Sequence, residues 1–159
     1  MKSDYMVMQM THEEIRQQLR EFNNILKETN AAYSELAKQN GLSDCAFWLM
    51  YSIREADGKC TQKDLCDQWI ISKQTVNSAL KGLEKNGYII LSASPTDRRS
   101  KYITLTGKGV EFAHEHIDIV FDLEQLVFQK MSDAERAAMI ESTRKYQELF
   151  RAEMKRFLK

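Results

Sequence analysis

The sequence predicts a mainly helical α+β protein that contains one small β-hairpin. Apolar residues recur at spacings of three and four through most of the 159 residues, and helix-capping patterns precede several of these segments. Only residues 88–105 contain short β-branched and aromatic runs around a polar loop. One proline and an apolar content of 43% are typical of a globular chain, so we expect residues 1–159 to form a single domain.

The first two predicted helices have clear boundaries. Thr11 and Glu14 form a capping box, and apolar residues then recur at helical spacing until Gly41. Ser43 can cap a second, more apolar helix, which the turn signal Asp57-Gly58 ends. We therefore expect a long helix over residues 11–40 and a shorter one after residue 43.

Two short helices joined by a tight link should follow. Thr61 caps the first, with Asp64 three residues later, and Ser72 caps the second, which ends at Gly87. Residues 69–71 form the link. The inward face of the second short helix consists of Val76, Ala79, Leu80 and Leu83.

The helical spacing of apolar residues stops after Gly87. Residues 88–91 and 101–105 are rich in β-branched and aromatic side chains, so they predict the two strands of a hairpin. The loop between them is polar and contains Pro95. We expect a β-hairpin with a long tip.

The remaining chain is again helical in pattern. Thr106 can cap a helix that reaches about Lys130. Ser132 and Glu135 form a second clear capping box, which begins a helix that continues to the C-terminus.

The short helices and the hairpin together have the layout of a helix-turn-helix followed by a wing. The net charge of the chain is zero, but residues 59–108 carry +5, against −3 for residues 1–58 and −2 for residues 109–159. The basic charge is therefore concentrated in the part of the chain that has this layout, which favours double-stranded DNA as a partner.

The polar face of the second short helix suits the major groove. Its side chains are short donors and acceptors with lysines around them: Lys73, Gln74, Thr75, Asn77, Ser78, Lys81 and Lys85. No acidic residue lies between Ser72 and Leu83, whereas a merely solvated helix more often pairs Glu with Lys. Glutamine forms two hydrogen bonds with adenine, and lysine neutralises phosphate. A solvated polar face without a partner is the alternative.

The tip of the hairpin contains Asp97, Arg98 and Arg99, and Lys101 begins the second strand. A wing beside a recognition helix reaches the neighbouring minor groove, where negative potential attracts arginine. Asp97 could hold Arg99 extended through a charge-assisted hydrogen bond. An ordinary polar turn with an Asp-Arg pair of little energetic value is the alternative.

These residues resemble the winged helix-turn-helix of the MarR family of bacterial transcription regulators. The resemblance covers about residues 42–109, and two segments carry it: "TQKDLCDQWIISKQTVNSALKGLEKNGYI" and "DRRSKYITLTGKG". It implies a winged helix-turn-helix region at residues 42–106 and helical dimerisation regions at 11–40 and 107–159. Matched residue by residue, Gln74, Thr75 and Ser78 fall on recognition-helix positions, and Asp97 and Arg99 fall on the wing pair. Ile70 departs from the pattern, because a small residue is common there.

We therefore expect a dimeric DNA-binding transcription regulator. The resemblance further implies a repressor that binds a pseudo-palindromic operator and is released by a small-molecule effector. The expected DNA-binding residues are Lys73, Gln74, Thr75, Asn77, Ser78, Lys81, Asp97, Arg98, Arg99 and Lys101. Candidates for effector contact are Phe47, Trp48, Met50 and Tyr51, although such side chains more often form the core.

Other functions find little support in the sequence. No catalytic triad, Cys-His pair or glycine-rich phosphate loop is visible, so we expect no enzyme and no cofactor. Cys60 and Cys66 with His114 and His116 lack the spacing of a zinc site. No signal peptide or membrane span is apparent, so we expect a cytoplasmic protein with no membrane partner.

Two alternatives stay open. The first is a thiol-based, redox-responsive regulator that uses Cys45, Cys60 or Cys66, although Cys45 lies among apolar residues that suggest a core position. The second is a winged-helix module that binds another protein; acidic residues in place of the lysines of the polar face would favour it, and they are absent.

Overall fold

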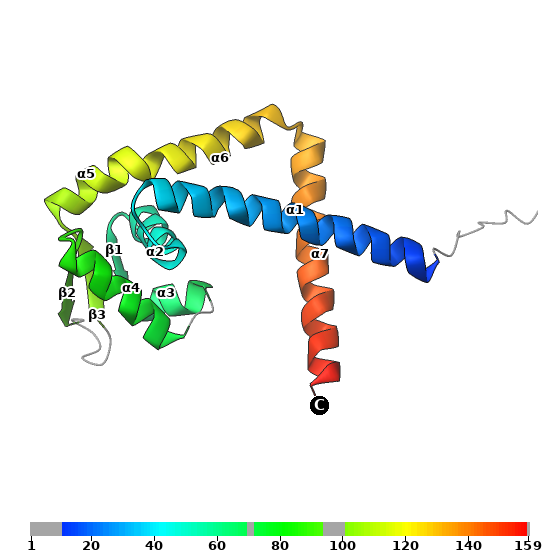
Figure 1. Cartoon of the computed structure of the whole chain (residues 1–159), viewed down its shortest axis with the longest axis horizontal. Coiled ribbons are helices and arrows are strands. Elements are labelled where there is room, and N and C mark those ends of the chain that lie inside the picture. Colours follow the sequence, from blue (N-terminus) through cyan, green and yellow to red (C-terminus); the bar gives the residue numbers. More distant parts are fainter. Residues whose placement is uncertain (1–10, 70–71, 94–100, 159) are drawn as a thin grey trace, which may run out of the picture. The chain divides into compact units, whose positions relative to one another are not determined.

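The computed structural model describes residues 11–69, 72–93 and 101–158 (Figure 1). These residues form helices α1 (His12–Gln39), α2 (Asp44–Glu55), α3 (Gln62–Trp69), α4 (Lys73–Lys85), α5 (Gly107–His116), α6 (Asp118–Lys130) and α7 (Asp133–Phe157), and strands β1 (Lys59–Thr61), β2 (Ile89–Ala93) and β3 (Lys101–Leu105). The mainly helical α+β class is confirmed. By its internal contacts the chain divides into two compact units, residues 1–110 and 111–159, and the single-domain interpretation stays a prediction.

The predicted caps begin the helices of the first unit. At the start of α1, the Thr11 hydroxyl accepts a hydrogen bond from the Glu14 N–H at 3.3 Å, and the Glu14 carboxylate accepts one from the Thr11 N–H at 2.6 Å. The Thr11 N–H and the Thr11 hydroxyl both donate to the Glu14 carboxylate, and these two bonds lower its pKa. Ser43 caps α2 through the Ala46 N–H at 3.2 Å. Because a cap satisfies N–H groups that have no partner inside the helix, each helix starts where the sequence predicts.

The core of the first unit lies between α2, α4 and the sheet. Four large side chains of α2 are completely buried: Phe47, Leu49, Met50 and Ile53. Helix α4 packs on α2 and α3 with the face that contains Val76, Leu80 and Leu83, each at most 1% exposed. The predicted apolar face of α4 is therefore confirmed, apart from Ala79, which is only partly buried.

The sheet has three antiparallel strands in the order β1-β3-β2, one more than the predicted hairpin. Ile103 of β3 lies between Cys60 of β1 and Leu91 of β2. Strand β1 follows a turn in which Asp57 and Gly58 have positive φ angles of 52° and 74°. Three residues are too few to show the alternation of a strand, so the sequence pattern could not predict β1.

Thr106 and Gly109 join the wing to the end of α4. The Thr106 hydroxyl donates to the Gly87 carbonyl at 2.6 Å and accepts from the Gly109 N–H at 2.9 Å, so one side chain caps α5 and holds the turn after α4. The backbone at Gly109 lies so close to Tyr88 that a Cβ atom there would be 1.9 Å from the Tyr88 carbonyl oxygen. Only glycine fits this position without movement of the backbone.

The helix expected from Thr106 to about Lys130 is broken, which corrects that prediction. Helix α5 ends at His116, and α6 begins at Asp118. Around the break the Val120 N–H donates to the Ile117 carbonyl at 2.8 Å, a three-residue spacing typical of a 3₁₀ turn. No glycine or proline marks this position, so the break has no signal in the sequence.

The second unit contains the elbow between α6 and α7. Ser132 and Glu135 form the predicted capping box at the start of α7. The Arg136 guanidinium donates to the Phe128 carbonyl at 2.8 Å, to the Met131 carbonyl and to the Asp133 carboxylate, so it satisfies the carbonyl end of α6. None of the residues of α7 is buried. No helix in the described ranges has the length and apolar character needed to cross a bilayer.

Replacement of Gly109 by alanine should destabilise the first unit by about 1–3 kcal/mol, because the new methyl group overlaps a backbone carbonyl that cannot move alone. Gly107→Ala is the matched control in the same helix, since a Cβ there meets nothing within 4 Å. The control should change stability by less than about 1 kcal/mol. Urea unfolding of both variants measures the difference, and equal stabilities would contradict the close approach.

Candidate nucleic-acid interface

The exposed face of α4 carries the predicted recognition residues. Burial of Val76, Leu80 and Leu83 turns the opposite side of the helix to solvent. The exposed residues on that side are Lys73, Gln74, Thr75, Ser78, Lys81 and Lys85. Asn77 lies at the edge of the face and is half-buried. The structure thus brings the seven predicted residues of the polar face onto one side of α4, as the helical period requires.

Two hydroxyl groups on this face, those of Thr75 and Ser78, already have partners in α4 or in its N-cap. The Ser72 hydroxyl accepts from the Thr75 N–H at 3.1 Å, and the hydroxyls of Ser72 and Thr75 are 2.8 Å apart. The Ser78 hydroxyl donates to the Gln74 carbonyl at 3.0 Å. A hydroxyl has one hydrogen, so Ser78 keeps only its acceptor capacity for a base or a bound water.

Several side chains on the face are free to bind a partner. Lys73, Gln74 and Lys81 form no side-chain hydrogen bond or ion pair with the residues that the structure describes. Gln74 retains both its carbonyl oxygen and its amide donors, the combination that binds adenine in the major groove. The lysines supply positive charge beside it for phosphate groups.

Side-chain hydrogen bonds hold both ends of the helix-turn-helix. The sequence predicted those at the start of α3 but not the one at the end of α4. At the start of α3, the Thr61 hydroxyl and N–H donate to the Asp64 carboxylate at 2.7 and 2.8 Å, and these bonds lower the pKa of Asp64. At the end of α4, the Lys108 ammonium donates to the Asn86 carbonyl at 2.8 Å and lies 5.0 Å from the centre of the Tyr88 ring. Sequence analysis missed Lys108, whose only signal is its position two residues after the Thr106 cap.

The wing is described only in its strands. Lys101 begins β3, is exposed and pairs with Ala93 of β2. The predicted wing residues Asp97, Arg98 and Arg99 lie outside the described residues, as does Ile70 of the turn. Of the four residues predicted to contact DNA from the wing, Lys101 is therefore the one that the structure describes.

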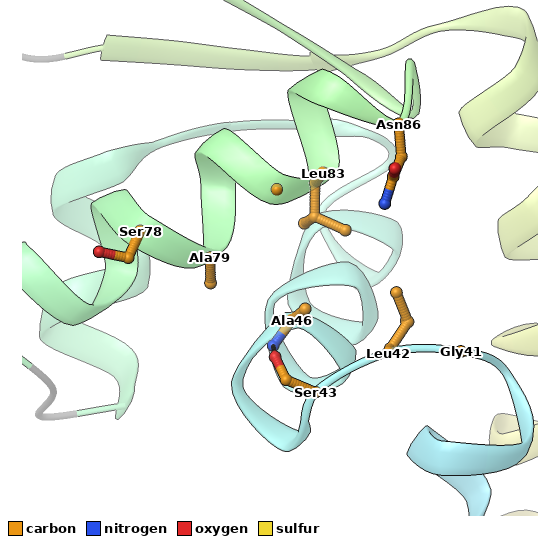
Figure 2. Close-up of a pocket in the computed structure, with 9 residues that line it drawn as sticks. Gly41, Leu42, Ser43, Ala46, Ser78, Ala79, Leu83 and Asn86 are labelled. Atoms are coloured by element: carbon orange, nitrogen blue, oxygen red, sulfur yellow. Dashed lines mark hydrogen bonds between the residues drawn. The ribbon is translucent and has the colours of Figure 1, made fainter.

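A pocket of about 200 Å³ separates the start of α2 from α4 (Figure 2). Ser43 and Ala46 lie on one side, and Ala79 and Leu83 lie on the other. Its lining is mostly glycine, alanine and serine, with no charged side chain. The pocket therefore has neither the aromatic surface nor the convergent polar groups of a small-molecule site.

The candidate effector residues fall into two groups. Phe47 and Met50 are completely buried and belong to the core. Trp48 and Tyr51 are half-buried and belong to a ring cluster, in which the Trp48 ring lies 4.8 Å from Tyr33, 5.5 Å from Tyr51 and 4.9 Å from Trp69 between centroids. This cluster joins α1, α2 and α3.

One cysteine differs from its predicted position. Cys45 and Cys66 are half-buried, so the core position expected for Cys45 is wrong, and the buried thiol is that of Cys60. Cys45 begins the first turn of α2, ahead of the buried stripe. Burial, together with the charge of Asp64, raises the pKa of Cys60 to about 12. Within the described ranges, no three His, Cys, Asp or Glu side chains gather to hold a metal ion.

Comparison with known proteins agrees with this geometry. Residues 40–100 match the model of the MarR family. The HTH-type transcriptional regulator SarZ of Staphylococcus epidermidis is 28% identical to this chain over 106 residues, which make up 67% of this chain and 68% of SarZ. The segment that matches the family model includes α3 and α4.

Two solved structures have the same fold. AbsC, a MarR family transcriptional regulator from Streptomyces coelicolor, aligns with a TM-score of 0.74 over 90% of this chain and 97% of AbsC, at 15% identity. Sco3205, a MarR family transcriptional regulator from the same organism solved in complex with DNA, aligns with a TM-score of 0.70 over 87% of this chain and 88% of Sco3205, at 21% identity.

The buried thiol provides a test of the redox alternative. Because the pKa of Cys60 is raised to about 12, native Cys60 should react with iodoacetamide at pH 8 at least tenfold more slowly than in denaturant, as mapped by mass spectrometry.

The same thiol should make stability depend on pH. In the unfolded chain the Cys60 thiol loses its proton near pH 9, so the stability that the neutral thiol provides in the folded chain should fall between about pH 9 and pH 12. Cys60→Ser should abolish this decline of stability with pH. In the reactivity experiment, equal iodoacetamide rates in the native and the denatured protein would support redox sensing.

Proposed function

Since the chain belongs to the MarR family through its winged helix-turn-helix at residues 40–100, we propose that it regulates transcription by inserting α4 into the major groove of DNA. The exposed face of α4 carries this proposal. It combines an unpartnered glutamine with lysines and short hydroxyl side chains, and its first three turns contain no acid. Such a face suits contacts with base edges and phosphates.

The proposal assigns different roles to the two parts of the interface. Gln74, Asn77 and Ser78 contact base edges, and Lys73, Thr75 and Lys81 contact phosphates or neighbouring bases. Arg98, Arg99 and Lys101 of the wing contact the minor groove and its phosphates, and Asp97 orients Arg99. The net charge of +5 in residues 59–108 supports this assignment, because phosphate contacts supply most of the baseline affinity for DNA.

The protein acts as a homodimer in this proposal. Many apolar side chains of α1 and α7 are exposed in the single chain; those more than 50% exposed are Ile15, Ile25, Leu149, Phe150, Phe157 and Leu158. A solvated helix seldom carries so many large apolar groups, whereas a helix that packs on a second copy does. A twofold dimer presents two α4 helices, so its operator is a pseudo-palindrome with half-sites about 10 bp apart.

In this proposal the protein is a cytoplasmic repressor, and binding of a small aromatic effector releases it from DNA. The ring cluster of Tyr33, Trp48, Tyr51 and Trp69 supports this part, because its rings are half-exposed and connect α1 to the end of α3. A planar ligand stacked on Trp48 would bury aromatic area next to the helix-turn-helix. Quenching of tryptophan fluorescence by an aromatic compound, with parallel loss of duplex binding, is the measurement that checks it.

Gln74 and Arg99 should affect DNA binding in different ways. Gln74→Ala should cost about 1–3 kcal/mol on a duplex selected from a random pool and relax one base-pair position per half-site, with little change on nonspecific DNA. Arg99→Ala should weaken binding to many sequences and make the salt dependence shallower. Asp97→Ala should reproduce part of the Arg99 effect.

Fluorescence anisotropy titrations at several salt concentrations measure these effects, and Glu84→Gln provides an exposed control on the same helix. Tighter binding by Asp97→Ala would contradict the orienting role. Unchanged specific binding by both Gln74→Ala and Arg99→Ala would contradict the whole interface.

Charged residues on the apolar face of α7 should dissociate the dimer. Leu149→Lys with Phe150→Lys removes two side chains that are 57% and 58% exposed in the protomer, so the fold of each chain should survive. Each such side chain contributes about 1.5–3 kcal/mol when buried at an interface. Light scattering should show a monomer, and affinity for the inverted repeat should fall at least about tenfold.

The exposed Gln147→Lys variant adds the same kind of charge between apolar positions of α7 and should leave the dimer intact. A wild-type protein that is monomeric at micromolar concentration, or a double variant that stays dimeric, would contradict this interface.

A further inference from the structure

Two polar side chains are buried among the described residues, and both hold the helix-turn-helix. Ser52 is 3% exposed and Gln62 is 4% exposed, whereas the other buried side chains are apolar. A buried hydroxyl or amide is unfavourable unless it forms a hydrogen bond. Each of these two side chains has one: the bond of Ser52 ends on Trp69, directly before residues 70–71, and that of Gln62 ends on Lys73, two residues after them.

Ser52 holds the last residue of α3. Its hydroxyl oxygen accepts a hydrogen bond from the indole N–H of Trp69 at 2.7 Å. The same Trp69 ring lies 4.9 Å from the Trp48 ring, between centroids, and Trp48 is also on α2. The end of α3 is thereby attached to α2 by one directional bond and one ring contact.

Gln62 holds the first residue of α4. Its side-chain amide donates to the backbone carbonyl of Lys73 at 3.4 Å, a long bond. Gln62 is the first residue of α3, so this bond connects the starts of the two helices. A carbonyl has two lone pairs, so the Lys73 oxygen accepts this bond without giving up its place in the α4 helix.

We propose that Ser52 and Gln62 are positioning residues for sequence recognition: their bonds to Trp69 and to the Lys73 carbonyl set the placement of α4 on α2 and α3. This inference rests on the proposed function. Apolar contacts resist separation of packed helices but tolerate small sliding and rotation, whereas hydrogen bonds depend steeply on direction. Gln74 follows Lys73 directly, so a shift of the Lys73 carbonyl moves the residue assigned to adenine.

This role predicts a particular pattern of DNA binding. Two hydrogen bonds to one base require a closely defined position of the glutamine, whereas phosphate contacts by flexible lysines do not. Loss of either anchor should therefore weaken binding to the preferred sequence and leave nonspecific binding unchanged. A residue that only stabilises the fold would lower both affinities or neither.

The test uses the full chain and two duplexes, one selected by the wild-type protein from a random pool and one with the same base composition in scrambled order. Ser52→Ala and Gln62→Met each remove one side of an anchor with little change in volume, and Trp69→Phe removes the indole N–H but keeps an aromatic ring. Each should weaken binding to the selected duplex about three- to tenfold and change binding to the scrambled duplex less than about twofold.

A double-mutant cycle tests the Ser52–Trp69 anchor further. The Ser52→Ala, Trp69→Phe double variant should bind the selected duplex no more weakly than either single variant, because both remove one bond. Ile103→Val is the matched control: it truncates a completely buried side chain in β3, and should lower stability without changing the ratio of the two affinities.

Three results would overturn the inference: unchanged ratios in Trp69→Phe and Gln62→Met, additive effects in the double-mutant cycle, or an equal change of the ratio in Ile103→Val. Trp69→Phe keeps a large ring at a half-buried position, so the test does not depend on how Ser52→Ala folds. A wild-type chain that selects no sequence at all would instead overturn the proposed function, and this inference with it.

Discussion

The placement of α4 depends on the burial of three side chains. Val76, Leu80 and Leu83 are at most 1% exposed, and complete burial of such side chains contributes about 1.5–3 kcal/mol each. Their sum approaches the net stability of a small domain. Because a helix has 3.6 residues per turn, burying this stripe forces the polar residues of α4 outward. The core of the first unit therefore determines which side chains are available to a duplex.

The ends of α4 are held by polar contacts, which complement the apolar stripe. Ser72 caps its start, while Lys108 and Thr106 bind carbonyls at and after its end. Such bonds add little net stability individually, but each fixes a direction that apolar packing leaves loose. By contrast, α1 and α7 have almost no buried residues, and their exposed apolar faces provide no comparable restraint within one chain.

The sequence could not predict features that lack a local pattern. Strand β1 is three residues long, and its pairing with β3 joins segments more than forty positions apart. The break at Ile117 has no glycine or proline. Cys45 lies among apolar residues in the sequence and Cys60 among polar ones, yet the fold leaves Cys45 half-buried and buries Cys60. In each case the cause is a long-range contact or burial, which a sequence window does not contain.

The sequence by itself determined most of the helices, their caps and the composition of the polar face of α4. These follow from side-chain chemistry within a few residues, as Thr11 with Glu14 and Ser132 with Glu135 illustrate. Only the tertiary structure decided that Gly109 must be glycine, and that Ser52 and Gln62 reach the two sides of the turn. Those properties depend on distances between atoms of different elements, and packing of the whole unit sets these distances.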